Sequence, residues 1–200
     1  MTFVQVLHFQ GVCIALQLLL LLMLLPLPQI RSTPCPSTVE EIVVANTSDA
    51  KTLAKALLCD GPANFTVSWH GNIMIYHTVS VSNGSTLNVT GSGITEDAVV
   101  TSDGTFLLFE VDRGSTVSLT DLTLSGGDGG LRVTGDSFVE VIDCTFTNNN
   151  ITSFDQGGAI FVNSSSMVLK GETVFANNTA FVGGAISLLD SSEIHIMEGG

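Results

Sequence analysis

Four carboxylate side chains recur at the spacing of a sequence repeat and are the best candidates for chemistry. Asp121, Asp143 and Glu172 each stand three residues before an apolar position of that repeat, and Glu198 follows Glu172 by 26 residues. Carboxylates stacked about 5 Å apart repel by about 1 kcal/mol in water and by more when partly desolvated, so such a row takes up protons or recruits a cation. Clustered oxygen ligands suit Ca²⁺, which makes these four residues a candidate calcium site. The competing interpretation is a row of solvated turns, where Asp and Gly are favoured. Solvated turns are favoured, because Ca²⁺ needs about six or more converging oxygens and a row of single carboxylates does not by itself supply them.

Two short motifs mark the repeat that would stack these carboxylates. Gly-Gly before an apolar segment occurs at 129–130, 157–158 and 183–184, and Phe-x-Asn-Asn occurs at 146–149 and 175–178, with a degenerate copy at 124–127. Between the motifs, short segments with apolar residues at alternate positions are separated by Gly, Asn, Asp and Ser, as in β-strands and turns. Strand spacing alone is equally typical of a β-sandwich. A period of about 20–50 residues built from short strands is instead typical of a solenoid, and it predicts parallel β-helix coils over residues 64–200.

Stacking of successive coils makes specific predictions about side chains. Coils lie about 4.8 Å apart, so equivalent residues of neighbouring coils should pile on one another. Leu124, Phe146 and Phe175 should form an internal apolar ladder, while Asn149 and Asn178 should form an asparagine ladder that satisfies backbone groups at a turn.

The segment before the coils has a different pattern. Residues 34–63 predict a linker, a short strand at 42–45 and a helix that has Thr47 or Ser48 as its N-cap and is stopped by Gly61-Pro62. Ala50, Leu53, Ala54, Leu57 and Leu58 form one apolar stripe on that helix. The open end of a β stack needs a cover, and we therefore expect this helix to cap the coils.

Besides the coils and the segment that caps them, we expect a secretory leader over residues 1–33. Residues 12–27 are almost wholly apolar, about the length of a signal-peptide core and short for a spanning helix. A cleaved signal peptide is the first interpretation, and an uncleaved signal anchor in a membrane is the alternative.

Asparagine usage also indicates the secretory route. Acceptor sequences for N-glycosylation, in excess of what composition predicts, occur at Asn46, Asn64, Asn83, Asn88, Asn150, Asn163 and Asn177. In an oxidising compartment Cys35 and Cys59, which flank the first structured segment, could form a disulfide. Cys144 shares the parity of Phe146 and should face the core as a free thiol.

The charge balance excludes some partners. The formal net charge is −13, with 6 Lys and Arg against 19 Asp and Glu, and the basic residues are scattered. Nucleic acids and anionic membranes require clustered basic residues, so neither is expected as a partner. His70, His77 and His195 lack metal-ligand spacing and are interpreted as surface residues.

Together, the Phe-x-x-Asn and Gly-Gly-Ala-Ile motifs carry a family resemblance. The full pair appears at 146–160 and 175–186, and it resembles the repeats of chlamydial polymorphic outer membrane proteins and of similar right-handed β-helix proteins of eukaryotic microbes. The resemblance covers about residues 114–200, with a weaker extension back to Phe65. It implies an all-β, right-handed parallel β-helix, a pectate-lyase-like solenoid with an N-terminal capping helix. The adhesin role of the chlamydial family carries over only weakly, because the 200 residues include no membrane β-barrel.

The function expected from the sequence is a non-catalytic binding, adhesion or structural role on the cell surface or outside the cell. The partners expected are an extracellular carbohydrate or a surface protein, with further coils or another chain at the C-terminal open end. The alternative is a carbohydrate-active enzyme, a polysaccharide lyase or a glycoside hydrolase, because many such enzymes share this fold. Fold alone does not imply function, and the sequence contains no recognisable catalytic motif.

Overall fold

The chain forms three parallel β-sheets that share one core. The computed structural model describes residues 35, 39–59, 61–92, 98–152 and 156–197. Sheet 1 contains, in spatial order, β1 (Glu40–Val44), β2 (Asn64–Trp69), β5 (Thr86–Gly91), β8 (Thr116–Thr120), β11 (Phe138–Ile142), β14 (Ser166–Lys170) and β17 (Glu193–Met197). Sheet 2 contains β3 (Asn72–Met74), β6 (Val99–Thr101), β9 (Thr123–Ser125), β12 (Thr145–Thr147) and β15 (Val174–Ala176). Sheet 3 contains β4 (Val79–Val81), β7 (Phe109–Val111), β10 (Leu131–Thr134), β13 (Ile160–Asn163) and β16 (Ile186–Leu189).

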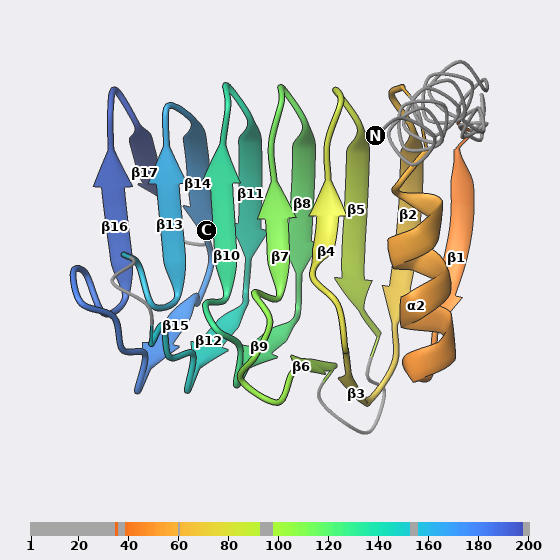
Figure 1. Ribbon diagram of the computed structural model, residues 1–200, viewed down its shortest axis with the longest axis horizontal. Helices are drawn as coiled ribbons and strands as arrows, with labels where there is room; N and C mark the ends of the chain where they lie inside the picture. The colour runs from red at the N-terminus through yellow and green to blue at the C-terminus, as the bar shows by residue number, and fades with distance from the viewer. Residues whose placement is uncertain (1–34, 36–38, 60, 93–97, 153–155, 198–200) are drawn as a thin grey trace, which may run out of the picture. The chain divides into compact units, whose positions relative to one another are not determined.

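In each coil the chain visits sheet 1, then sheet 2, then sheet 3. Each strand pairs in parallel with the equivalent strand of the next coil, for example β8 with β11 and β11 with β14. Figure 1 shows sheet 3 nearest the viewer, sheet 1 behind it and sheet 2 along the lower edge. The predicted parallel β-helix is confirmed.

Strict alternation along the strands builds the core. Val117, Val139 and Met167 lie in register on successive coils of sheet 1, and all three are fully buried, while their sequence neighbours point outward. The predicted apolar ladder is present in sheet 2, where Phe146 pairs with Leu124 on one side and with Phe175 on the other. The rings of Phe146 and Phe175 are stacked, with centroids 5.4 Å apart. Like residues therefore lie on like residues, as the repeat predicts.

The repeated Gly-Gly pairs also lie on one another. The backbone N–H of Gly130 donates to Gly158 O, and the N–H of Gly158 donates to Gly183 O. A Cβ atom at Gly158 would lie 2.4 Å from the Gly184 carbonyl oxygen, closer than any real contact. The motif therefore recurs because neighbouring backbones approach too closely there for a side chain.

An asparagine ladder joins the coils at the turn between sheets 2 and 3. The side chain of Asn149 is fully buried, accepts a hydrogen bond from Gly127 N and donates to Leu124 O, both at 3.0 Å. Asn178 repeats the pattern one coil on, and its amide donates to Phe146 O at 2.8 Å. The ladder satisfies backbone groups that face the core and would otherwise lack partners.

A second ladder, of serines, lies at the turn between sheets 3 and 1 and was not predicted. Ser85, Ser115, Ser137 and Ser165 each immediately precede a strand of sheet 1 and are buried. The Ser137 hydroxyl accepts from Ser115 N, and the Ser165 hydroxyl accepts from Ser137 N. The Ser115 hydroxyl, by contrast, is buried with no hydrogen-bond partner.

Helix α2 (Thr47–Ala56) packs its apolar stripe against the first coil and caps the core (Figure 1). Its boundaries differ from the prediction. The N-cap is Asn46, whose side chain accepts from Ser48 N and Asp49 N, rather than Thr47 or Ser48. The helix ends at Ala56, ahead of Gly61-Pro62, so Leu58 falls beyond the apolar stripe and is 73% exposed.

The other end of the solenoid exposes apolar side chains. Leu188 and Ile196 occupy the inward register positions of Val162 and Leu169, yet they are 46% and 77% exposed. In the described residues no strand pairs with the outer edges of β15, β16 and β17. Further coils or another chain at this end remain a prediction.

Cys144 is a free cysteine and fully buried, as predicted. Burial raises the pKa of its thiol to about 11. No helix in the described ranges is long and apolar enough to cross a membrane. The leader predicted at residues 1–33 lies outside those ranges.

Candidate functional site

The predicted carboxylate row is regular for two coils and shifts at the third. Asp121 and Asp143 follow strands that are paired at Thr120 and Ile142, and both adopt positive φ values, 54° and 52°. In the next coil Ile142 pairs with Lys170, so Gly171 takes the equivalent position and Glu172 is an added residue. Thr145 then pairs with Val174, which shows that this turn contains one residue more than the turn before it.

These carboxylates are engaged in different ways. Asp121 and Asp143 line one shallow cavity of about 240 Å³ together with Thr123 and Thr145. The Asp143 carboxylate accepts a hydrogen bond from Glu172 N at 2.8 Å, so it is turned toward the backbone of the next coil. Glu198 lies outside the described residues. Within the described chain, no three or more His, Cys, Asp or Glu side chains gather in a group that could hold a metal ion, and calcium binding stays a prediction.

A groove on the outer face of sheet 3 contains more varied side chains than the carboxylate row does. The outward side chains of Ser80, Glu110, Arg132 and Phe161 stand in register on four successive coils. The groove over this row has a volume of about 270 Å³, and Thr78, Leu107, Asp128 and Ile151 also line it. One acid, one guanidinium and one aromatic ring therefore follow one another at one-coil intervals.

Local contacts hold the groove in shape. The guanidinium carbon of Arg132 lies 5.4 Å from the centre of the Phe161 ring, a cation–π distance that fixes both side chains. The Asp128 carboxylate accepts from Thr152 N at 3.2 Å and so ties one wall to the turn that follows Asn150. The sequence did not reveal this site, because its residues come from strands and loops of different coils and belong to neither repeated motif.

The predicted glycosylation sites point away from the core. Asn163 is half-buried, and the other six acceptor asparagines are exposed: Asn46, Asn64, Asn83, Asn88, Asn150 and Asn177. The two ladder asparagines, Asn149 and Asn178, are not acceptors. The row of Ser80, Glu110, Arg132 and Phe161 contains no acceptor, but Asn163 is the last residue of β13 and faces outward on sheet 3, two residues beyond Phe161. The other acceptors stand in turns, at the start of α2 and on sheet 1.

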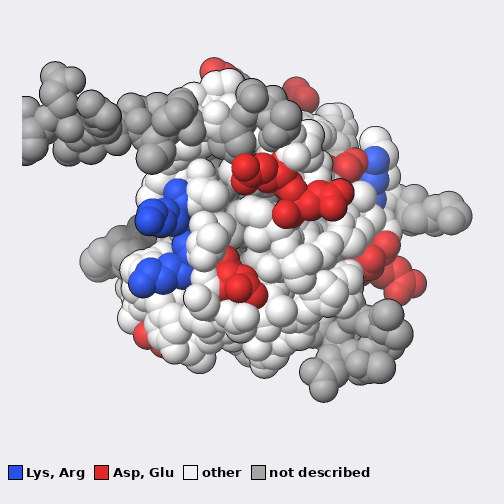
Figure 2. All heavy atoms as spheres, turned by 90° about the vertical axis from the view of Figure 1, so that its right-hand side faces the viewer, with Lys and Arg blue, Asp and Glu red and all other residues white. Residues whose placement is uncertain are grey.

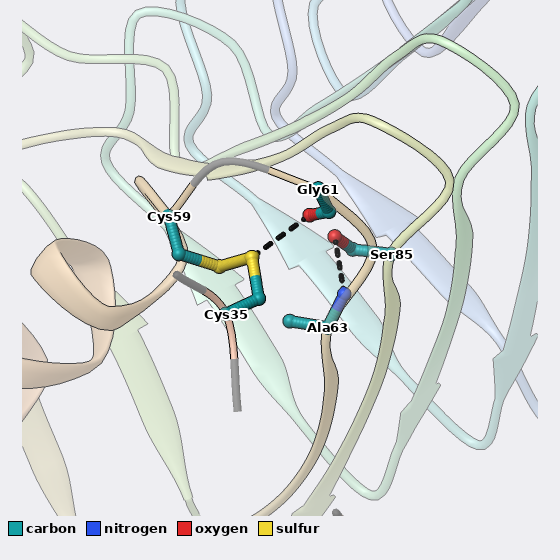
Figure 3. The surroundings of a disulfide bond; sticks show 5 residues. All are labelled: Cys35, Cys59, Gly61, Ala63 and Ser85. Carbon is teal, nitrogen blue, oxygen red and sulfur yellow. Dashed lines mark hydrogen bonds between the residues drawn. A yellow bond between two sulfur atoms is a disulfide. The ribbon is translucent and has the colours of Figure 1, made fainter. Parts of the chain in front are cut away.

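Cys35 and Cys59, the predicted pair, are joined by a disulfide, with Cα atoms 5.0 Å apart (Figure 3). The Cys35 sulfur also lies 3.0 Å from the Gly61 carbonyl oxygen. A sulfur in a disulfide has no proton to donate, so this is a close polar contact. Next to it, Ala63 N donates to the Ser85 hydroxyl at 3.1 Å, where the serine ladder meets the first coil.

One carboxylate outside the candidate sites, Asp103, has a shifted pKa. The pKa of Asp103 is lowered because the side chain and backbone of Thr105 donate hydrogen bonds to its carboxylate in an exposed loop. A general acid of a glycosidase requires the opposite direction, a raised carboxyl pKa.

Three parallel sheets, internal ladders and a repeating coil define a right-handed β-helix protein. A family model described as "Right handed beta helix region" matches residues 77–198, more than half of the chain, and the chain belongs to that family. The match does not separate the chlamydial repeats from other members. None of the curated proteins and none of the solved structures matches the chain.

Proposed function

We propose that this chain is a secreted or cell-surface glycoprotein with a non-catalytic binding role, and that the groove on sheet 3 is its ligand-binding face. The observation that carries the proposal is the row of Glu110, Arg132 and Phe161, which projects from three successive coils into one groove. Carbohydrate is the ligand that this chemistry favours. An aromatic ring packs against the C–H face of a sugar, while a carboxylate and a guanidinium exchange hydrogen bonds with its hydroxyl groups.

The positions of the acceptor asparagines support the same face. A glycan at Asn83 would stand in the turn between sheets 3 and 1, a glycan at Asn163 would stand at the end of β13, and glycans at Asn150 and Asn177 would stand near the turn between sheets 2 and 3. None of these acceptor asparagines lines the groove itself. The disulfide supports an oxidising compartment. A signal-anchored membrane protein exposes the same groove and is the alternative location.

Binding of the secreted chain to an array of polysaccharides tests the proposal. Phe161→Ala and Glu110→Gln should abolish binding to the captured glycan. Phe138→Ala is the matched control, because Phe138 is an outward phenylalanine on sheet 1, 39% exposed and outside the groove. Equal loss in the control, or unchanged binding in both groove variants, would refute the assignment.

The cavity shared by Asp121 and Asp143 favours one second candidate, a carbohydrate-active enzyme. Two carboxylates on adjacent coils could act as an acid and base pair. Incubation with acidic and neutral polysaccharides, followed by detection of shortened products, separates the two functions. Products that form with the unaltered chain and disappear with Asp143→Asn would replace the binding proposal with the enzyme.

A further inference from the structure

A second cavity lies between the capping helix and the first coil, far from the motifs of the repeat. It measures about 480 Å³, within the range of small-ligand sites. Its helical wall includes Ser48, Ala50 and Lys51 of α2, and its other wall is the segment Ile75, Tyr76 and His77 between β3 and β4. Neither wall belongs to the groove on sheet 3.

Both walls are held in place by the surrounding coils. The Thr47 hydroxyl donates to Met74 O at 3.1 Å and joins the start of α2 to the end of β3. On either side of the Tyr76–His77 bend, Ile75 N and Val79 N donate to carbonyl groups of the next coil at 2.7 and 3.0 Å. The His77 ring packs at 59° against Phe106, with centroids 5.9 Å apart. The cavity is therefore preformed, which lowers the cost of binding.

The chemistry of the lining is unusual for this chain. Ala50 and Ile75, each 3% exposed, form an apolar floor, and Tyr76 stands half exposed above it. Lys51 contributes a positive charge, and none of the described lining residues is Asp or Glu, although acidic residues outnumber basic ones by 19 to 6. The nearby Asp49 carboxylate accepts from Ala45 N and the Asn46 amide, so it is occupied at the helix cap. Figure 2, which faces this end of the molecule, shows basic side chains at the left margin with an acidic side chain beside them, and further acidic side chains across the face.

We infer that this cavity binds a carboxylate-bearing sugar, a uronic acid unit. Lys51 pairs with the carboxylate, the apolar floor and the Tyr76 ring pack against the C–H faces of the sugar, and Ser48 and His77 bond to its hydroxyl groups. A neutral sugar of the same shape lacks the group that Lys51 recognises. The inference does not depend on the groove of sheet 3, because the two cavities share no residue.

Calorimetric titration of the secreted chain with D-glucuronate, before and after enzymatic removal of N-glycans, tests the inference. The expected dissociation constant is about 1 mM, typical of a ligand with so few atoms. D-Glucose should bind at least about tenfold more weakly, and Lys51→Gln should weaken glucuronate binding about tenfold.

Lys55→Gln is the matched control. Lys55 lies one turn further along the same helix and does not line the cavity, so its loss removes the same charge from the same element. Binding should be unchanged in this variant and weakened in Tyr76→Ala. Equal binding of glucose, equal weakening by Lys55→Gln, or no heat with glucuronate at tenfold the expected constant would each overturn the inference.

Discussion

Replacement of Asn149 by alanine should remove a large part of the stability of the solenoid. The side chain makes three hydrogen bonds, to Gly127 N, Leu124 O and the Asn178 amide oxygen. In Asn149→Ala the N–H of Gly127 and the carbonyl of Leu124 stay buried without partners, at a cost of about 1–3 kcal/mol each. The Asn178 oxygen keeps its bond from Asn149 N, so it adds little. The expected loss is about 2–6 kcal/mol, against a total of about 5–15 kcal/mol for a typical domain.

Chemical denaturation measures this loss with two probes. Circular dichroism follows all the coils, and fluorescence of the single tryptophan, the buried Trp69 of β2, follows the first coil. Asn148→Ala is the control, because Asn148 is exposed and its positive φ of 55° costs an alanine only about 1–2 kcal/mol. Asn149→Asp should be as damaging as alanine, since its carboxylate keeps the acceptor but faces the Leu124 oxygen. The reasoning fails if Asn149→Ala costs no more than Asn148→Ala.

Three further predictions concern the serine ladder and the cysteines. Ser137→Ala removes the acceptor for Ser115 N and should cost about 1–3 kcal/mol in denaturant unfolding, whereas Ser115→Ala removes an unpartnered hydroxyl and should be neutral or stabilising. The opposite order would contradict the assigned hydrogen bonds. Cys35→Ser or Cys59→Ser should each lower the unfolding free energy by about 3 kcal/mol, and adding reductant should destabilise only the unaltered chain. Burial raises the pKa of the Cys144 thiol from 9.0 to about 11, so the unfolded chain loses that proton first, and stability should fall as the pH rises through this interval. At pH 8 iodoacetamide should label Cys144 only after denaturation, and rapid labelling of the folded chain would show that the thiol is accessible.

The repeat motifs predicted the fold because they report the close contacts between coils. Gly158 recurs where backbones nearly touch, and Phe146 and Asn149 recur where the core needs a ring and an amide. Each of these positions accepts essentially one residue type, so the repeat can be recognised in a single sequence.

The weaker constraints explain what the sequence did not predict. The serine ladder occupies one position per coil, but Ser is common in every turn of this chain, and the spacing of Ser115, Ser137 and Ser165 varies with loop length. The same variation in loop length gave Glu172 the wrong position in the predicted carboxylate row, because a turn that gains one residue shifts the alignment without changing either motif. Cavities formed by loops of different length, such as the groove on sheet 3, have no sequence period at all.

The outward rows of the sheets differ in a way that bears on function. On sheet 1 the outward positions of the early coils repeat small polar residues, such as Thr86 beside Thr116, which β-sheet packing alone favours. On sheet 3 the row passes from Glu110 to Arg132 to Phe161 without any repetition. Cross-strand pairs such as Arg132 beside Phe161 add only about 0.2–1 kcal/mol each, whereas most of the stability of a solenoid comes from its internal ladders and from contacts between neighbouring coils. A row that departs from the repeat, and that carries charge and an aromatic ring into a groove, is better explained by what it binds than by what it stabilises.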